Sequence, residues 1–181
     1  MRIIGGELKG RRFSVPTHFP VRPTTDFARE ALFNILNNRV DYQSGSVLDL
    51  FCGTGSITLE AWSRGCRDIT AVDKHAGCCK YLAQLIQRFD LKGIKILKED
   101  ALLAVNRSTR KFDLIFADPP YDYPQYAELV NLLMSKDLLN DEGLVVIEHS
   151  AATKPENWPG YENTRQYGSV NFSFLSKQPD V

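Results

Sequence analysis

Four consecutive residues, Asp118-Pro119-Pro120-Tyr121, carry the most informative chemistry of the chain. They follow the apolar run Phe112–Ala117, so we expect them at the carboxyl end of a strand, where ligands bind in open α/β sheets. Asp118 supplies a carboxylate, Pro119 a carbonyl acceptor and Tyr121 a flat ring. Two acceptors beside a stacking face suit an exocyclic amine on a nucleobase, as in adenine, cytosine or guanine. The alternative is a strand that stops at two prolines, with Tyr121 packed on the core.

A glycine-rich loop, Asp49 to Gly55, links the first expected strand of a sheet to a helix. Its two glycines, Gly53 and Gly55, let the backbone turn sharply and approach a ligand, and the helix start beyond them favours an anionic group. Asp73 lies at the end of the next strand and is placed to accept both hydroxyls of a ribose. Asp100 ends the third strand and could accept from an adenine amine. Each of these two aspartates could instead cap the helix that follows it.

The residues of this loop discriminate between two nucleotide cofactors. A nicotinamide-binding fingerprint needs a third glycine, and this chain has Thr58 in that position. Asp49, before the glycines, suits a cationic amino group better than a pyrophosphate. The adenine, ribose, carboxylate and ammonium of S-adenosylmethionine match Asp100, Asp73, the glycine loop and Asp49 in that order. The expected donor-binding residues are Asp49, Phe51, Gly53, Thr54, Gly55, Asp73, Lys74, Asp100, Ala101 and Asp118.

The composition is that of a globular protein, with 181 residues of which 43% are hydrophobic and 24% charged. No apolar run approaches the ~20 residues that a membrane span needs. The first residues lack the apolar core of a secretory signal, so we expect a cytoplasmic location. The cysteines Cys52, Cys66, Cys78 and Cys79 form no Cys-x-x-Cys pair, and the three histidines are scattered. We therefore expect reduced thiols and no metal site.

Positive charge gathers near the N-terminus of a chain whose formal net charge is zero. Among the first twelve residues only Glu7 opposes four cations, and Arg22 follows. A basic arm on a neutral body can contact phosphates, which would make it a site for RNA; the alternative is a solvated hairpin with ordinary surface charge. The candidate RNA-binding residues are Arg2, Lys9, Arg11, Arg12 and Arg22.

The order of the expected elements indicates an α/β fold. Residues 1–22 are typical of a short hairpin with a loop, and a helix follows Pro23-Thr24-Thr25-Asp26. Strands and helices then alternate, which predicts a mostly parallel sheet covered on both faces. The expected strands are Val47–Phe51, Ile69–Val72, Ile94–Leu97, Leu114–Ala117 and Leu144–Glu148, with helices at Ser56–Ser63, 76–89, 101–106 and 125–135.

The C-terminal part departs from this alternation. Tyr161–Tyr167 and Val170–Leu175 predict an antiparallel hairpin that closes one edge of the sheet. Glu148 and His149, where the fifth strand ends, could belong to the site or to a satisfied strand terminus, and we favour the terminus. We expect one domain over residues 1–181, with an N-terminal extension and helix at 1–40 and a catalytic core at 44–181.

With these motifs in place, the chain resembles the bacterial 16S ribosomal RNA guanine-N2 methyltransferases, a family of class I S-adenosylmethionine-dependent enzymes. The resemblance runs over about residues 2–150. Its motifs are Arg2-Ile3-Ile4-Gly5-Gly6 with Lys9-Gly10-Arg11, Arg22-Pro23-Thr24-Thr25-Asp26 with Arg29–Asn34, Leu48–Gly55 with Glu60 and Ser63-Arg64-Gly65, and Asp118-Pro119-Pro120-Tyr121. It implies a class I methyltransferase (Rossmann-like) fold with a mostly parallel, doubly wound sheet. The C-terminal antiparallel hairpin and the short N-terminal β-hairpin and helix, which the residue pattern predicts, would be added to this sheet.

The same resemblance implies a reaction and its participants. A methyl group would pass from S-adenosylmethionine, held at the glycine loop, to the exocyclic N2 of a guanine in 16S ribosomal RNA. The RNA would be in the small subunit or an assembly intermediate. Asp118, Pro119, Pro120 and Tyr121 would be the catalytic residues. The alternatives are an N6-adenine methyltransferase acting on DNA or RNA, a nicotinamide-dependent oxidoreductase and a non-catalytic RNA-binding module.

Overall fold

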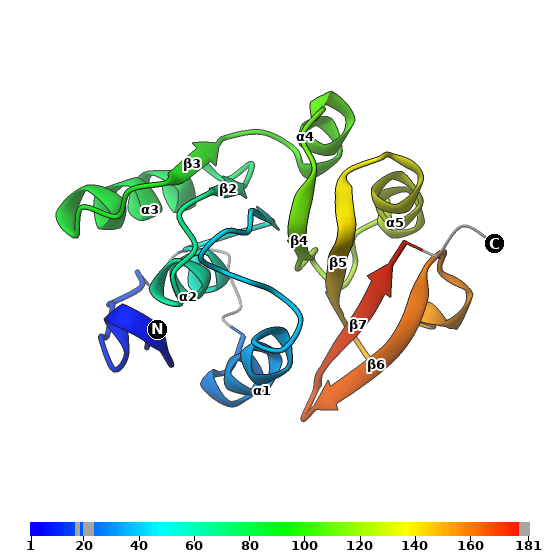
Figure 1. Cartoon of the computed structure of the whole chain (residues 1–181), viewed down its shortest axis with the longest axis horizontal. Helices are drawn as coiled ribbons and strands as arrows, with labels where there is room; N and C mark the ends of the chain where they lie inside the picture. Colours follow the sequence, from blue (N-terminus) through cyan, green and yellow to red (C-terminus); the bar gives the residue numbers. More distant parts are fainter. Residues whose placement is uncertain (17–18, 20–23, 178–181) are drawn as a thin grey trace.

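The computed structural model describes residues 1–16, 19 and 24–177, and in this part of the chain seven strands form one sheet (Figure 1). The strands are β1 (Val47–Leu50), β2 (Ile69–Val72), β3 (Ile94–Leu97), β4 (Phe112–Ala117), β5 (Leu139–His149), β6 (Tyr161–Tyr167) and β7 (Val170–Ser176). Their order in the sheet is β3-β2-β1-β4-β5-β7-β6. Strands β1 to β5 are parallel, and β7 pairs antiparallel with both β5 and β6.

Helices cover both faces of this sheet. They are α1 (Asp26–Leu36), α2 (Ser56–Ser63), α3 (Ala76–Arg88), α4 (Ala101–Arg107) and α5 (Tyr126–Ser135), with 3-10 turns η1 (Gly6–Leu8) and η2 (Pro155–Asn157). Successive residues of a strand point to opposite faces. Phe116 accordingly packs in the core that contains α1, α2 and α3, whereas Ile115 packs in the core of α4 and α5. The mostly parallel, doubly wound α/β sheet predicted from the sequence is confirmed.

Several strand ends differ from the prediction, β4 for example beginning at Phe112 and not at Leu114, and two of the differences have a local reason. β1 ends at Leu50, because Phe51 adopts a left-handed conformation with φ of 59° that cannot continue a strand. β5 begins at Leu139 and not at Leu144, and its pairing with β4 shifts register in between. The first residues of β5 are mostly polar, so a search for runs of apolar residues does not detect this part of the strand. The C-terminal hairpin is confirmed, with β7 inserted beside β5 and β6 at the sheet edge.

The N-terminal segment pairs with itself as expected, but over a shorter length than a regular hairpin. One antiparallel bridge joins Arg2 to Arg12 around the η1 turn. Gly6 lies in this turn with φ of 72°, and a Cβ atom there would approach the Ser63 carbonyl oxygen to 1.7 Å. Only glycine therefore allows the segment to lie this close to the end of α2.

Glu60 of α2 holds the same segment in place. Its carboxylate is fully buried and accepts the backbone N–H groups of Ile4 at 2.8 Å and Gly5 at 2.9 Å. Arg64 pairs with it at 2.9 Å, and the buried Arg29 of α1 lies 3.7 Å away. A buried carboxylate is stable only when it is paired and hydrogen-bonded, and here its partners come from the N-terminal segment, α1 and α2.

We expect Glu60→Gln to destabilise the protein strongly, because the two arginines lose their buried counter-charge. Removing one partner of a buried ion pair costs roughly 3–5 kcal/mol. Urea unfolding monitored by circular dichroism measures the change. The control is Glu30→Gln, an exposed glutamate of α1 whose replacement should stay within about 0.5 kcal/mol of the wild type. Equal stability of the two variants would contradict the role of Glu60.

Candidate functional site

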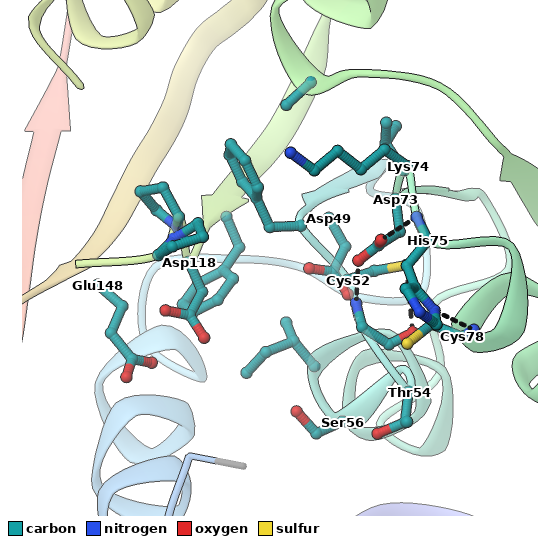
Figure 2. A pocket seen from close by; sticks show the side chains of 18 of the residues that line it. Asp49, Cys52, Thr54, Ser56, Asp73, Lys74, His75, Cys78, Asp118 and Glu148 are labelled. Carbon is teal, nitrogen blue, oxygen red and sulfur yellow. Dashed lines mark hydrogen bonds between the residues drawn. The ribbon is translucent and has the colours of Figure 1, made fainter. Parts of the chain in front are cut away.

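A cavity of about 570 Å³ opens at the carboxyl ends of the parallel strands (Figure 2). The chain lays down β2 and β3 on one side of β1, then β4 and β5 on the other. The connection after β1 therefore leads to α2 on one face, and the connection after β4 leads to α5 on the opposite face. Where neighbouring connections diverge in this way, an open sheet forms a ligand-binding crevice.

The predicted donor-binding residues line this cavity, with Gly55 as the exception. Gly55 has φ of 84° at the start of α2, and a Cβ atom there would lie 2.5 Å from Leu82 Cδ1 of α3. The left-handed backbone and the close approach of Leu82 therefore already require a glycine at this position, apart from any contact with a ligand. Phe51, by contrast, lies in the cavity wall and holds its left-handed backbone while its ring packs edge-on against Tyr123.

Asp73 fixes the glycine loop to the end of β2. Its Oδ2 accepts the N–H of Gly53 at 2.8 Å and its Oδ1 accepts the N–H of His75 at 2.7 Å. Each carboxylate oxygen can accept a further hydrogen bond, so the pair remains suited to two ligand hydroxyls. The interpretation of Asp73 as a helix cap is wrong, because His75 caps α3 by accepting the N–H of Cys78 through its Nδ1.

Asp100 does cap a helix. Its Oδ1 accepts the N–H groups of Leu102 at 2.9 Å and Leu103 at 3.4 Å at the start of α4. Both bonds use one oxygen, which leaves Oδ2 outside the cap. Since Asp100 and Ala101 also line the cavity, the cap and the predicted ligand contact are compatible.

Asp49 is a buried carboxylate at the centre of the cleft. It is 1% exposed, and its Oδ2 accepts both the N–H and the hydroxyl of Thr58. Burial raises the pKa of Asp49 to about 7, while the two hydrogen bonds from Thr58 oppose that rise. Thr58, which replaces the third glycine of a nicotinamide fingerprint, thus holds Asp49 in position.

The corner formed by residues 118–121 faces the glycine loop across the cavity, and all four of its residues line the wall. The N–H of Asp118 donates to the carbonyl of Leu50 at 3.4 Å, which ties the corner to the end of β1. Pro119 is buried, whereas Tyr121 is 40% exposed at the rim. The alternative that packs Tyr121 in the core is therefore wrong.

Glu148 also lines the cavity, and our interpretation of it as a strand terminus alone is wrong. The carboxylate is 4% exposed, and the Thr24 hydroxyl donates to its Oε2 at 2.9 Å. His149 does fit that interpretation: it is buried, and its Nε2 lies 2.7 Å from the Ser173 hydroxyl. The signal in the sequence was that Glu148 lies at the carboxyl end of an expected strand, where ligands bind in open α/β sheets.

The predicted RNA-binding residues are distributed over the N-terminal segment. Arg2 pairs with Asp26 at 3.0 Å, and Lys9 is exposed beside the η1 turn. Arg11 lies over the Phe89 ring, 4.6 Å from its centroid. Arg12 lines a second hollow of about 370 Å³, together with Arg88 and Gln84 of α3. Arg22 lies outside the described residues.

Arg88 is a further cation that our sequence analysis missed. No local motif marks it, because its proximity to the arm arises only when α3 packs beside the N-terminal segment. Arg12 and Arg88 line the hollow together with Phe89, and the guanidinium groups of Arg11 and Arg88 lie over the Phe89 ring, so three cations gather at one place that a phosphate chain could contact.

Three further observations concern cysteine pairing, metal sites and membrane-spanning helices in the described residues. All four cysteines are buried and unpaired, and Cys52 is only 6% exposed. Within residues 1–16, 19 and 24–177, no group of three or more histidine, cysteine, aspartate or glutamate side chains is arranged to hold a metal ion. In the same residues no helix has the length and apolarity needed to cross a bilayer.

Comparisons with known proteins agree with this geometry. A family model described as "Conserved hypothetical protein 95" matches residues 1–176. The chain is 31% identical over 162 residues to "Ribosomal RNA small subunit methyltransferase D" of Escherichia coli K12, covering 87% of this chain and 81% of that one. The solved structure of "Putative methyltransferase yhhF" from Escherichia coli superposes with a TM-score of 0.83 at 29% identity, covering 98% and 99% of the two chains. The fold is that of the class I methyltransferases.

The buried position of Asp49 leads to a prediction about stability. An aspartate in the unfolded chain ionises near pH 4, whereas Asp49 in the folded protein has a pKa of about 7. The folded state thus binds more protons in this window, so rising pH lowers the free energy of unfolding. Compared with Asp49→Asn, the wild type should lose up to about 1.4 kcal/mol per pH unit between about pH 4 and 7. Urea unfolding at several pH values tests this, and parallel pH profiles would contradict it.

Proposed function

Because this chain belongs to the Conserved hypothetical protein 95 family, we propose that it transfers a methyl group from S-adenosylmethionine to the N2 amine of a guanine in 16S ribosomal RNA. One observation carries this proposal. The glycine loop after β1 and the corner at residues 118–121 after β4 line a single cavity from opposite sides. A donor held by the loop would therefore share that space with an amine held by the corner.

The cavity wall fits S-adenosylmethionine group by group. Asp73 would accept the ribose hydroxyls, Asp100 the adenine amine and Asp49 the ammonium group, next to the backbone of Gly53. The ammonium group favours the ionised form of Asp49, whose burial otherwise favours the protonated form. When bound, S-adenosylmethionine supplies an electrophilic methyl group on its sulfonium.

The corner would prepare the accepting amine. The lone pair of guanine N2 is delocalised into the ring, which makes this nitrogen a weak nucleophile. Asp118 and the Pro119 carbonyl would accept its two N–H bonds, orient the nitrogen and stabilise the positive charge that develops there. Asp118 is also placed to take the proton that the nitrogen releases. Tyr121, exposed at the rim, would stack on the base, a contact worth roughly 1–3 kcal/mol.

The N-terminal segment would bind the RNA around the target. We assign residues 1–40 as an RNA-contacting extension and residues 44–181 as the catalytic core of one domain. The supporting observation is that Arg12 and Arg88 line one surface hollow and that Arg11 lies over the Phe89 ring of the same hollow, although the chain as a whole is neutral. The expected partner is 16S RNA in the small subunit or an assembly intermediate, which places the enzyme in the cytoplasm.

The decisive experiment uses the methyl-labelled donor with undermethylated small subunits, free 16S RNA and DNA. We expect N2-methylguanosine at one nucleotide of the 16S RNA, identified by mapping the labelled product. Label in N6-methyladenosine, or in DNA, would overturn the proposed reaction in favour of an adenine methyltransferase. Binding of NAD without binding of the donor would point to an oxidoreductase.

We expect Asp118→Ala to fold and still to bind the donor through Asp49, Asp73 and Asp100, but to lose about 10²-fold or more in the rate of methyl transfer. The reason is that removing one group that stabilises charge in the transition state has an effect of this size. Single-turnover rates and equilibrium dialysis of the donor measure the two quantities separately. The control is the exposed neighbour Asp122→Ala, which should leave both unchanged. Near-normal turnover by Asp118→Ala would remove this residue from the mechanism.

We expect the double variant Arg11→Ala/Arg12→Ala to bind RNA with a weaker dependence on salt. Each lost phosphate contact should reduce the slope of log affinity against log salt by roughly 0.7–0.9. The matched control is Arg107→Ala/Arg110→Ala, which removes two exposed arginines near the end of α4, where they pair with Glu99 and Asp68. If the slope is the same for both double variants, the N-terminal arm is ordinary solvated surface.

A further inference from the structure

Two carboxylates lie side by side at the end of the cavity that would receive the base. β4 and β5 are parallel and pair in register at Ala117 and Ile147, so Asp118 and Glu148 are the next residues of adjacent strands. Neighbouring strands are about 4.8 Å apart, and residues two apart on a strand share a face. Phe116 and Val146 point to the same core, which directs Asp118 and Glu148 to one face as well. Figure 2 shows both side chains at this end of the cavity, away from Asp73.

Contacts from two other elements position Glu148. The Thr24 hydroxyl, just before α1, donates to Glu148 Oε2 at 2.9 Å, and the Tyr126 hydroxyl of α5 donates to the Glu148 backbone carbonyl at 2.5 Å. The carboxylate is 4% exposed and lines the cavity. A carboxylate offers about four acceptor positions, so Glu148 can accept from a ligand while it keeps the bond from Thr24.

The nucleobases differ in what they present beside their exocyclic amine. Guanine has a ring N1–H directly next to its N2 amine, so two adjacent groups are donors. Adenine and cytosine have a ring nitrogen with a lone pair next to their amines. A second carboxylate beside the amine-binding corner therefore attracts guanine and repels adenine and cytosine. Enzymes that act on an extruded base recognise it through hydrogen bonds to its Watson–Crick edge, which carries these groups.

We propose that Glu148 is the residue that makes the site specific for guanine, by accepting a hydrogen bond from N1–H while Asp118 and Pro119 hold the N2 amine. This assignment rests on the proposed function and deepens it. The corner at residues 118–121 suits any exocyclic amine, whereas Glu148 selects the base that carries it. A site built to pair with a ligand hydrogen rejects an analogue that lacks it, because a buried polar group is then left unpaired.

The test uses 2-aminopurine in place of the mapped target guanine in reconstituted small subunits. This base keeps the 2-amine, but its N1 carries a lone pair and no hydrogen. We expect the wild type to prefer guanine over 2-aminopurine by at least about 10-fold to 100-fold, the equivalent of one hydrogen bond to a charged group. In Glu148→Gln the side-chain amide can donate to that lone pair, so the guanine preference should fall by about 10-fold or more.

For each enzyme we take the ratio of the rate on guanine to the rate on 2-aminopurine. This ratio is then compared between each variant and the wild type, so the effect of the missing O6 of 2-aminopurine, which is common to all of them, cancels. Glu142→Gln, an exposed glutamate near the other end of β5, should keep the wild-type preference. Thr24→Val removes the hydroxyl that orients Glu148, so it should also lower the preference for guanine over 2-aminopurine. It tests the role of Glu148 independently if Glu148→Gln folds poorly.

An unchanged guanine preference in Glu148→Gln and Thr24→Val would overturn the role of Glu148 and leave the proposed function standing. Failure of the wild type to methylate guanine N2 in any substrate would overturn both. Donor binding, measured by equilibrium dialysis, should be the same in all variants, because Glu148 lies at the base end of the cavity.

Discussion

The whole site depends on one feature of the sheet topology. After β3 the chain returns to the centre of the sheet and adds β4 on the other side of β1. β1 has β2 on one side and β4 on the other, so the chain leaves their carboxyl ends toward opposite faces of the sheet. A single cavity forms where the two connections diverge. One wall is a glycine loop and the other a proline corner, and neither could face the other if the strands had followed one another in simple order.

Buried or half-buried carboxylates that accept backbone N–H groups then fix the parts of this arrangement that lie outside the helices and strands. Asp73 holds Gly53 and His75, which sets the position of the donor loop against β2. Glu60 holds Ile4 and Gly5, which sets the N-terminal segment against α2. The same interaction, a charge-assisted hydrogen bond from a backbone N–H group to a carboxylate, thus positions both the proposed binding site for S-adenosylmethionine and the proposed RNA-binding arm.

The proposed recognition of RNA divides among three separate elements. Arginines of the N-terminal arm and α3 would supply affinity for phosphate, which carries no information on sequence. The corner after β4 would hold an amine, and Glu148 at the end of β5 would distinguish the base that bears it. Because these contacts come from different parts of the chain, affinity, chemistry and base specificity can each change without loss of the others.

The sequence by itself determined the α/β class, the position in the chain of each sheet strand and of the helices between them, and the carboxylates near the ends of β1, β2 and β4. Alternating apolar patterns, glycines and prolines are local signals that each segment carries alone. Only the tertiary structure decided that His75 and not Asp73 caps α3, that Gly55 packs on Leu82, and that Glu148 faces the cavity while His149 turns away. These outcomes depend on strand register and helix packing between segments far apart in the chain, which no local pattern encodes.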